Sequence, residues 1–357
     1  MQRRAKLLLL AWTTLLGACS RESTVSTEQA EGNAGAPAVA FRSRLEIPVK
    51  GAPTQVRTFD IDADGLPELA ATTRGVVGSG GPRGHLYLWS EGPDEPPRVI
   101  ELPDYLLGPV AALFPDGLRL VLASQSSDEL LWLDPVAENP LEGLGRFALE
   151  GRPRALASGV LEPGGPPTLA CATRSELVLI TPGEGVTRHP LPEPLPTLVH
   201  VEEGRIVLGT QTGGRLWVWK ANRSQGLIGE PESVDLEGIP RDLLVRDDSW
   251  LIAAGDRDLV VVRDGKVVER RDLGAVPLSL AATDGAAWGL SFYDLTLHRI
   301  DQGTARLYAG QDPREVALAD LDGDSWPELV IANRGANRLS LLRGSPEGPA
   351  RPNNLNT

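Results

Sequence analysis

A proline recurs at a regular interval along this chain, each time just ahead of a strand-like segment. Successive copies are roughly 36 to 56 residues apart, close to the roughly 40 to 50 residues of one four-stranded propeller blade. The seven copies are Pro53, Pro109, Pro153, Pro196, Pro240, Pro277 and Pro313. This period predicts an architecture of small repeated sheets, and the chain shows no long helical periodicity that would favour another fold.

Each repeat has the same internal order of strands, and its second strand is rich in small residues, as in TLACAT of the third repeat. Only six repeats are followed by a fourth strand. The segment that matches the missing fourth strand is RLEIPV at residues 44–49, which precedes the first repeat. Because a closed ring hides its edge strands, we predict an all-β, seven-bladed β-propeller over residues 43–344, closed by this N-terminal strand, which completes the last blade. An open or two-domain β structure is the alternative.

The first residues predict export. MQRRAKLLLLAWTTLLGACS has a basic start, an apolar run too short to span a bilayer, and the sequence Leu-Gly-Ala-Cys. This sequence resembles the bacterial lipobox, which implies removal of residues 1–18 as a signal peptide and lipidation of Cys19; an ordinary signal peptide is the alternative. The serine after Cys19 favours the outer membrane under the sorting rule of enteric bacteria, with the chain held there by its lipid anchor.

The segments flanking the repeats have compositions typical of disorder. Residues 20–42 are rich in Ser, Glu, Gly and Ala, so we predict that residues 19–42 are the lipidated cysteine and a flexible tether. Residues 345–357 are rich in Pro, Gly and Asn and are predicted to be a disordered tail. The only other cysteine, Cys171, is expected to be buried as a small apolar residue.

The chain is acidic. Loss of Arg3, Arg4 and Lys6 with the signal peptide takes the formal charge from −13 to −16. Nucleic acids and anionic lipid surfaces both require a positive protein face, so this balance argues against either as a partner.

Two acidic loops of one design stand near the ends of the folded region, DIDADGLPEL at residues 60–69 and DLDGDSWPEL at residues 320–329. Each places carboxylates at positions 1, 3, 5 and 9 in the turn between the first and second strands of its repeat, a spacing that wraps oxygen ligands around a hard cation. The predicted ligands are Asp60, Asp62, Asp64, the carbonyl of Leu66 and Glu68 in one loop, and Asp320, Asp322, Asp324, the carbonyl of Trp326 and Glu328 in the other. The carboxylate-rich cage favours structural Ca²⁺ over Mg²⁺, whereas a plain Asp-Gly turn is the alternative.

With these loops and the seventh unit, DLDGDSWPELVIANRGANRLSLLRG, the chain resembles the FG-GAP/VCBS repeat family. The resemblance is specific for the first and seventh repeats, since the five between them lack the acidic loop. It implies a seven-bladed propeller with Ca²⁺ in its inter-strand loops and an adhesive or scaffolding role.

The sequence favours a binding protein over an enzyme. The four histidines, His85, His189, His200 and His298, fall in different repeats without ligand-like spacing, and no nucleophile elbow or phosphate-binding loop is present. We therefore expect a monomeric, lipid-anchored propeller that binds a protein or glycan partner. The alternatives are a scaffold for outer-membrane assembly and a propeller enzyme with an active site on its axial face.

Overall fold

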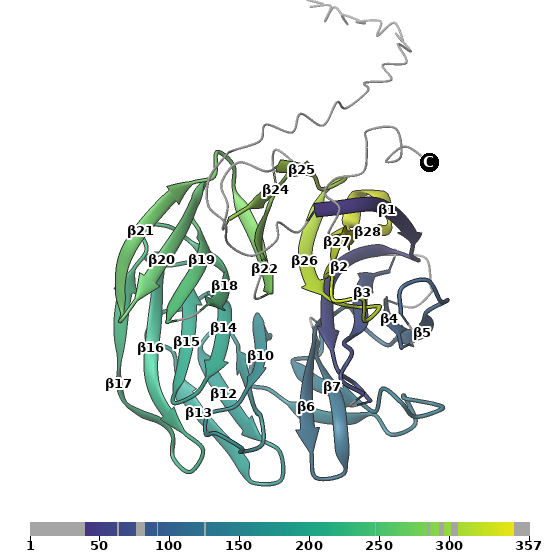
Figure 1. Cartoon of the computed structure of the whole chain (residues 1–357). Coiled ribbons are helices and arrows are strands. Elements are labelled where there is room, and N and C mark those ends of the chain that lie inside the picture. The colour runs from purple at the N-terminus through teal and green to yellow at the C-terminus, as the bar shows by residue number, and fades with distance from the viewer. Residues whose placement is uncertain are drawn as a thin grey trace, which may run out of the picture.

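The computed structural model describes residues 40–62, 64–75, 83–90, 92–124, 126–246, 248–283, 286–292, 296–300 and 306–345. The predicted signal peptide, Cys19, nearly all of the tether and nearly all of the tail lie outside these residues. The described residues form seven four-stranded antiparallel sheets arranged around one axis (Figure 1). This confirms the predicted all-β, seven-bladed propeller.

The blades follow one another in chain order. Blade one contains β2 (Ala52–Phe59), β3 (Glu68–Arg74), β4 (Gly84–Trp89) and β5 (Arg98–Leu102). Blade two contains β6 (Leu106–Phe114), β7 (Gly117–Ser124), β8 (Glu129–Leu133) and β9 (Gly145–Ala148). Blade three contains β10 (Ala155–Gly159), β11 (Thr168–Ala172), β12 (Glu176–Thr181) and β13 (Gly185–Pro190). Blade four contains β14 (Pro196–Glu202), β15 (Arg205–Thr210), β16 (Arg215–Asn222) and β17 (Gly226–Asp235). Blade five contains β18 (Pro240–Arg246), β19 (Ser249–Ala254), β20 (Asp258–Arg263) and β21 (Lys266–Asp272). Blade six contains β22 (Pro277–Thr283), β23 (Ala286–Ser291), β24 (Thr296–Arg299) and β25 (Arg306–Tyr308).

Blade seven is built from both ends of the described chain. Its strands are β26 (Pro313–Ala319), β27 (Glu328–Asn333), β28 (Arg338–Ser345) and, as the outer strand, β1 (Ala40–Pro48). The pairing of β1 with β28 extends from Ala40 opposite Ser345 to Pro48 opposite Arg338, as predicted for ring closure. The strand pair is longer than expected, since β1 begins inside the segment predicted as tether and β28 reaches Ser345, the first residue assigned to the tail.

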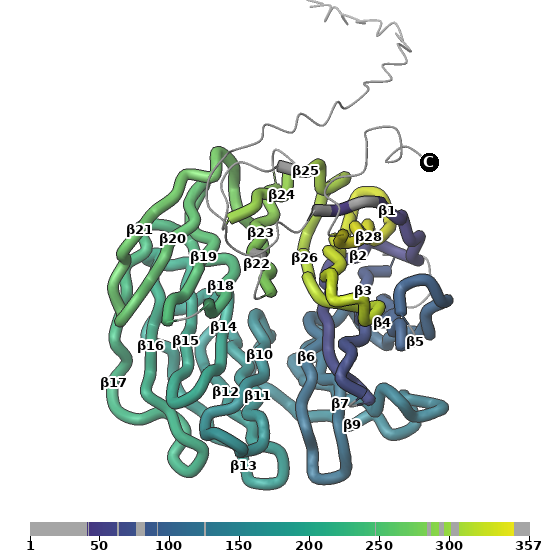
Figure 2. The backbone as a smooth tube through the Cα atoms, in the orientation of Figure 1, coloured from purple at the N-terminus to yellow at the C-terminus, as the bar shows by residue number. Residues whose placement is uncertain are grey.

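The repeat prolines lie at or within three residues of the start of the seven inner strands, which encircle the axis in Figure 2. In six blades the pairing between the inner strand and the second strand shifts register close to the proline, as between Pro53 and Gln55 or Pro240 and Asp242. A proline has no N–H to donate to the ladder and is tolerated at the start of a strand or beside a bulge. The repeat proline thus lies near the start of each inner strand.

The hydrophobic core lies between neighbouring blades. Every residue of β11, β19 and β27 is buried, as expected for second strands covered on both faces. One cluster joins Trp288 of blade six to Leu329 of blade seven and to Phe41 of β1, whose ring centroid lies 5.4 Å from that of Trp288. Cys171 is buried between blades two and three, and this burial raises the pKa of its thiol to about 12.

Helix is almost absent from the described residues. The one helical element is the short 3₁₀ turn η1 (Arg334–Ala336). A membrane-spanning helix, long and apolar enough to cross a bilayer, is not found in this part of the chain.

Candidate functional site

The inner strands are the edge strands of their sheets, and side chains from the preceding blade satisfy part of their backbone. In four blades the residue two places after the repeat proline accepts a hydrogen bond from an N–H of the following inner strand. The pairs, acceptor first, are Gln55 with Gly108, Asp242 with Leu280, Ser279 with Val316, and Glu315 with Val56, at 2.6, 2.8, 3.4 and 2.8 Å. Buried backbone donors require such partners, so this position joins adjacent blades around the axis.

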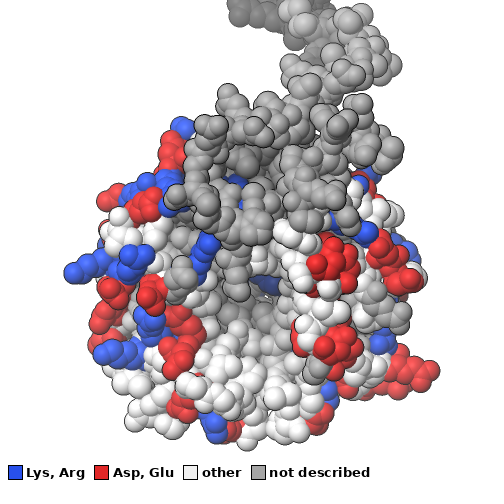
Figure 3. All heavy atoms as spheres, viewed as in Figure 1, with Lys and Arg blue, Asp and Glu red and all other residues white. Residues whose placement is uncertain are grey.

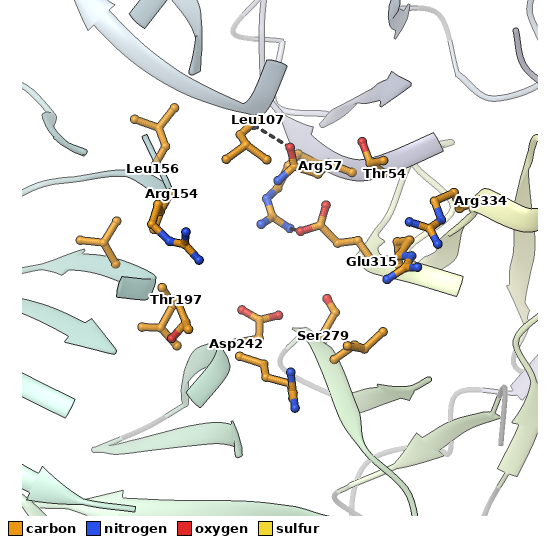
Figure 4. Close-up of a pocket in the computed structure, with 18 of the residues that line it drawn as sticks. Thr54, Arg57, Leu107, Arg154, Leu156, Thr197, Asp242, Ser279, Glu315 and Arg334 are labelled. Atoms are coloured by element: carbon orange, nitrogen blue, oxygen red, sulfur yellow. Dashed lines mark hydrogen bonds and ion pairs between the residues drawn. The ribbon is translucent and has the colours of Figure 1, made fainter. Parts of the chain in front are cut away.

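The residues next to these linking side chains surround an axial cavity of about 370 Å³. All seven inner strands contribute to its lining. Figure 4 shows side chains that converge on its open middle, among them Arg57, Arg154, Thr197, Asp242 and Glu315. Because the lining comes mainly from the first residues of the inner strands, the cavity lies toward the end of the axis that is remote from the turns between first and second strands.

The cavity is cationic although the chain is acidic. Five arginines line it, Arg57, Arg154, Arg241, Arg314 and Arg334, against two carboxylates, Asp242 and Glu315. No feature of any single repeat predicted this site. The signal that could have found it was the residue directly after the repeat proline, which is arginine in blades three, five and seven.

Three of these arginines have acidic partners. Arg57 Nη1 lies 2.5 Å from Glu315 Oε1, while Arg314 Nη2 and Arg334 Nε lie 2.8 and 2.5 Å from Asp312. Burial raises the pKa of Glu315 to about 7, although Arg57 and the N–H of Val56 act in the opposite direction. Glu315 is therefore a buried acid kept in place by an ion pair and by its link to blade one.

The first acidic loop brings together three of its predicted ligands. Carboxylate oxygens of Asp60, Asp62 and Glu68 lie within 4.8 Å of one another. Asp64 lies outside this group, and its Oδ1 accepts a hydrogen bond from the N–H of Leu66 at 2.8 Å. Burial raises the pKa of Glu68, assisted by the charges of Asp62 and Asp64.

The seventh-blade loop repeats this geometry. Asp320, Asp322 and Glu328 form the equivalent group within 4.8 Å, and Asp324 Oδ1 accepts the N–H of Trp326 at 2.8 Å. Burial and the charges of the neighbouring aspartates raise the pKa of Glu328 to about 7. Three converging carboxylates, one of them fully buried, are an all-oxygen donor set that fits a hard divalent cation.

The two acidic loops are neighbours across the joint where the ring closes. A Cβ placed on Gly323 would lie 3.4 Å from Leu66 Cδ2, so the side chain of Leu66 packs against the other loop. An ion pair between Arg343 of β28 and Asp94, in the turn between β4 and β5, also connects blades seven and one. Ordering of either loop would therefore stabilise the closure of the ring.

Most of the exposed large hydrophobic side chains lie on one face of the ring. We call the face that carries the turns between first and second and between third and fourth strands the turn face. Ten of the twelve exposed large hydrophobic side chains in the described part of the chain lie in or near these turns: Leu66, Val99, Leu113, Val136, Leu141, Val160, Val186, Ile228, Val245 and Val268. Six of them belong to blades two to four, and Figure 3 shows a largely uncharged surface below β6, β7, β12 and β13 of Figure 1.

The histidines do not assemble into a site at the axis. None of the four lines the axial cavity. His85 is buried and its Nδ1 lies 3.3 Å from Thr73 Oγ1, while His200 lies 3.7 Å from Glu202. Burial lowers the pKa of His85 and of His189.

Comparison with known proteins supports the fold without assigning a family. No family model matches the chain. Over 118 residues it is 30% identical to actin-interacting protein 1-2 of Arabidopsis thaliana, a match that covers 32% of this chain and only 16% of that protein.

Solved structures similar to the chain are found among proteins of different activities. The structure of BBS1N in complex with ARL6DN has a TM-score of 0.65 at 12% identity and covers 86% of this chain and 96% of that one. Virginiamycin B lyase from Staphylococcus aureus has 0.62 at 8%, with 84% and 98% covered, and the WD40 propeller domain of Doa1 has 0.60 at 11%, with 86% and 97% covered. At these identities the similarity shows a shared seven-bladed β-propeller fold and no shared activity.

Proposed function

We propose that this chain is a non-enzymatic binding propeller of the bacterial cell envelope, held at the outer membrane by a lipid on Cys19, and that it docks a protein partner on its turn face. Structural Ca²⁺ in the two acidic loops and membership of the FG-GAP/VCBS repeat family are parts of this proposal. A glycan partner, which the sequence left open, is less favoured than a protein because the exposed side chains are aliphatic.

The observation that carries the proposal is the concentration of exposed aliphatic side chains on one face. Monomeric proteins rarely expose contiguous apolar surface without using it to bind another molecule. Leu113 is 52% exposed and Val136 67% exposed, and both belong to blade two. The acidity of the chain argues against an anionic membrane as the surface covered by this face, which leaves a protein.

Two of the similar proteins support this conclusion by their names. One is called actin-interacting, and another was solved as a complex with ARL6DN. The lyase among the similar structures is the reason to keep an axial-face enzyme as an alternative. Among the described residues no histidine, cysteine or lysine lines the axial cavity of this chain, and its one serine, Ser279, is hydrogen-bonded to Asp242 and also accepts the N–H of Val316.

The test compares native complexes purified from envelope extracts. The double variant Leu113→Asp with Val160→Asp places charge on the turn face, while Leu45→Asp, at a similarly exposed position of β1, is the matched control. We expect the wild type and the control to retain one stoichiometric partner and the double variant to lose it with an unchanged melting temperature. Equal retention by all three, or no partner with the wild type, would contradict the proposal.

A further inference from the structure

Three successive inner strands place polar groups at the same position of the axial cavity. The residue directly after the repeat proline is Arg154 for β10, Thr197 for β14 and Arg241 for β18. All three line the cavity, and Figure 4 shows Arg154 and Thr197 on the same side of its open middle. Blades three, four and five therefore form a polar wall made of two guanidinium groups and one hydroxyl.

The hydrogen-bonding capacity of this wall is largely unused. Arg241 Nε and Thr197 Oγ1 are buried atoms without a hydrogen-bond partner. Arg154 is exposed to solvent and makes one long contact within the chain, from Nε to the carbonyl of Pro196 at 3.3 Å. Buried polar groups that lack a partner cost free energy, so Arg241 and Thr197 favour the binding of an acceptor at this wall.

The charge of the wall is also uncompensated. Among the described residues neither Arg154 nor Arg241 forms an ion pair, in contrast to Arg57, Arg314 and Arg334 of the same cavity. Asp242 follows Arg241 directly, but its carboxylate accepts the N–H groups of Leu243 and Leu280 and is committed to the link with blade six. Two cations in a partly enclosed cavity attract an anion more strongly than they would in open solvent.

We propose that Arg154, Thr197 and Arg241 bind the carboxylate or phosphate group of a small soluble organic anion in the axial cavity. Guanidinium groups present paired N–H donors that match the oxygens of a carboxylate or phosphate, and a threonine hydroxyl adds a third donor. The cavity of about 370 Å³ lies within the size range of small-molecule sites. It opens away from the turn face, so this site is separate from the proposed protein partner and does not rest on it.

The test titrates the purified mature protein with succinate, citrate and inorganic phosphate, with sodium chloride at matched ionic strength as the reference, by calorimetry and by thermal shift. We expect saturable binding of at least one of these probes below about 10 mM. Arg154→Gln and Arg241→Gln, made separately, should each weaken that binding about tenfold or more, because each removes a charged donor. Arg152→Gln, an exposed position outside the cavity, should leave it unchanged.

The separate variants keep the test decisive if one of them fails to fold, which a melting curve reports. Binding of phosphate alone assigns the site to phosphorylated compounds, and binding of a carboxylate assigns it to carboxylic acids. An acidic peptide that binds in place of all three probes would assign the site to a protein segment and overturn the proposal. The absence of saturable binding, or binding that neither arginine substitution weakens, would also overturn it.

Discussion

Replacement of Glu328 by glutamine should make the metal-free protein less sensitive to pH. Glu328 is buried beside Asp320 and Asp322, and its pKa rises from 4.5 to about 7 in the folded state. Folding therefore favours the protonated acid: the stability that Glu328 contributes is fully present below about pH 4.5 and is lost as the pH rises through about 7. A shift of this size corresponds to at most about 3 kcal/mol, and contact of the site with solvent reduces it.

The metal should reverse this dependence. Ca²⁺ binds the ionised carboxylates, so it stabilises the fold most at high pH, by about 2.7 kcal/mol per independent site at one hundred times the dissociation constant. Glutamine at position 328 retains a carbonyl oxygen to accept the N–H of Leu321, a contact that Glu328 makes at 2.9 Å. The substitution thus removes the charge while it preserves the turn.

The assay is urea unfolding of wild type and Glu328→Gln between pH 5 and 8, with millimolar Ca²⁺ and with excess chelator. In chelator, the wild type should lose more stability than the variant as the pH rises; in Ca²⁺, the wild type should be the more stable of the two at pH 8. The comparison with the variant is needed because Glu315, whose pKa is also about 7, contributes a similar trend to both proteins. Identical pH profiles for the two proteins, unchanged by Ca²⁺, would refute the metal site and the reasoning behind it.

Three further outcomes are expected. Deletion of residues 43–50 removes most of β1 and should lower the melting temperature of the whole ring, whereas deletion of residues 346–357 should not; equal melting of the two truncations would be incompatible with closure by β1. Glu315→Ala should cost about 3 kcal/mol in urea unfolding, because it leaves Arg57 and the N–H of Val56 without their partner, and Glu315→Gln should cost clearly less; similar losses for both would show that the link between blades seven and one contributes little. Cys19→Ser should abolish labelling by radioactive palmitate and release the protein from the membrane fraction, and continued labelling would disprove the lipoprotein assignment.

The architecture was predictable because it repeats. Each repeat proline lies near the start of its inner strand, and the displaced strand at residues 44–49 had to pair with a chain end that lacked a fourth strand. The buried second strands were also predictable, because a run of small and aliphatic residues recurs at the same place in each repeat. The acidic loops were recognisable because their ligands are close in sequence, although the structure groups three carboxylates and leaves Asp64 and Asp324 to cap the turn.

The axial cavity and the turn face were not predictable from single repeats. Arg154 and Arg241 are in separate blades, and only the ring geometry places their side chains around one cavity. Likewise Leu113 and Val160 appear in sequence at the ends of two apolar strand-like segments, where a buried position is the usual expectation. Their exposure depends on the turns being at the surface, which follows from the assembled ring.

The most direct test of the central claim is photo-crosslinking in living cells from single positions of the turn face. A photoreactive amino acid at Val136, which is 67% exposed, should form a crosslink to one discrete envelope protein, and the same residue at Leu45, away from that face, should not. This account predicts that the Val136 crosslink disappears when Leu113 and Val160 are both changed to aspartate. Crosslinks that form equally from both positions, or that survive the two substitutions, would contradict a partner docked on the turn face.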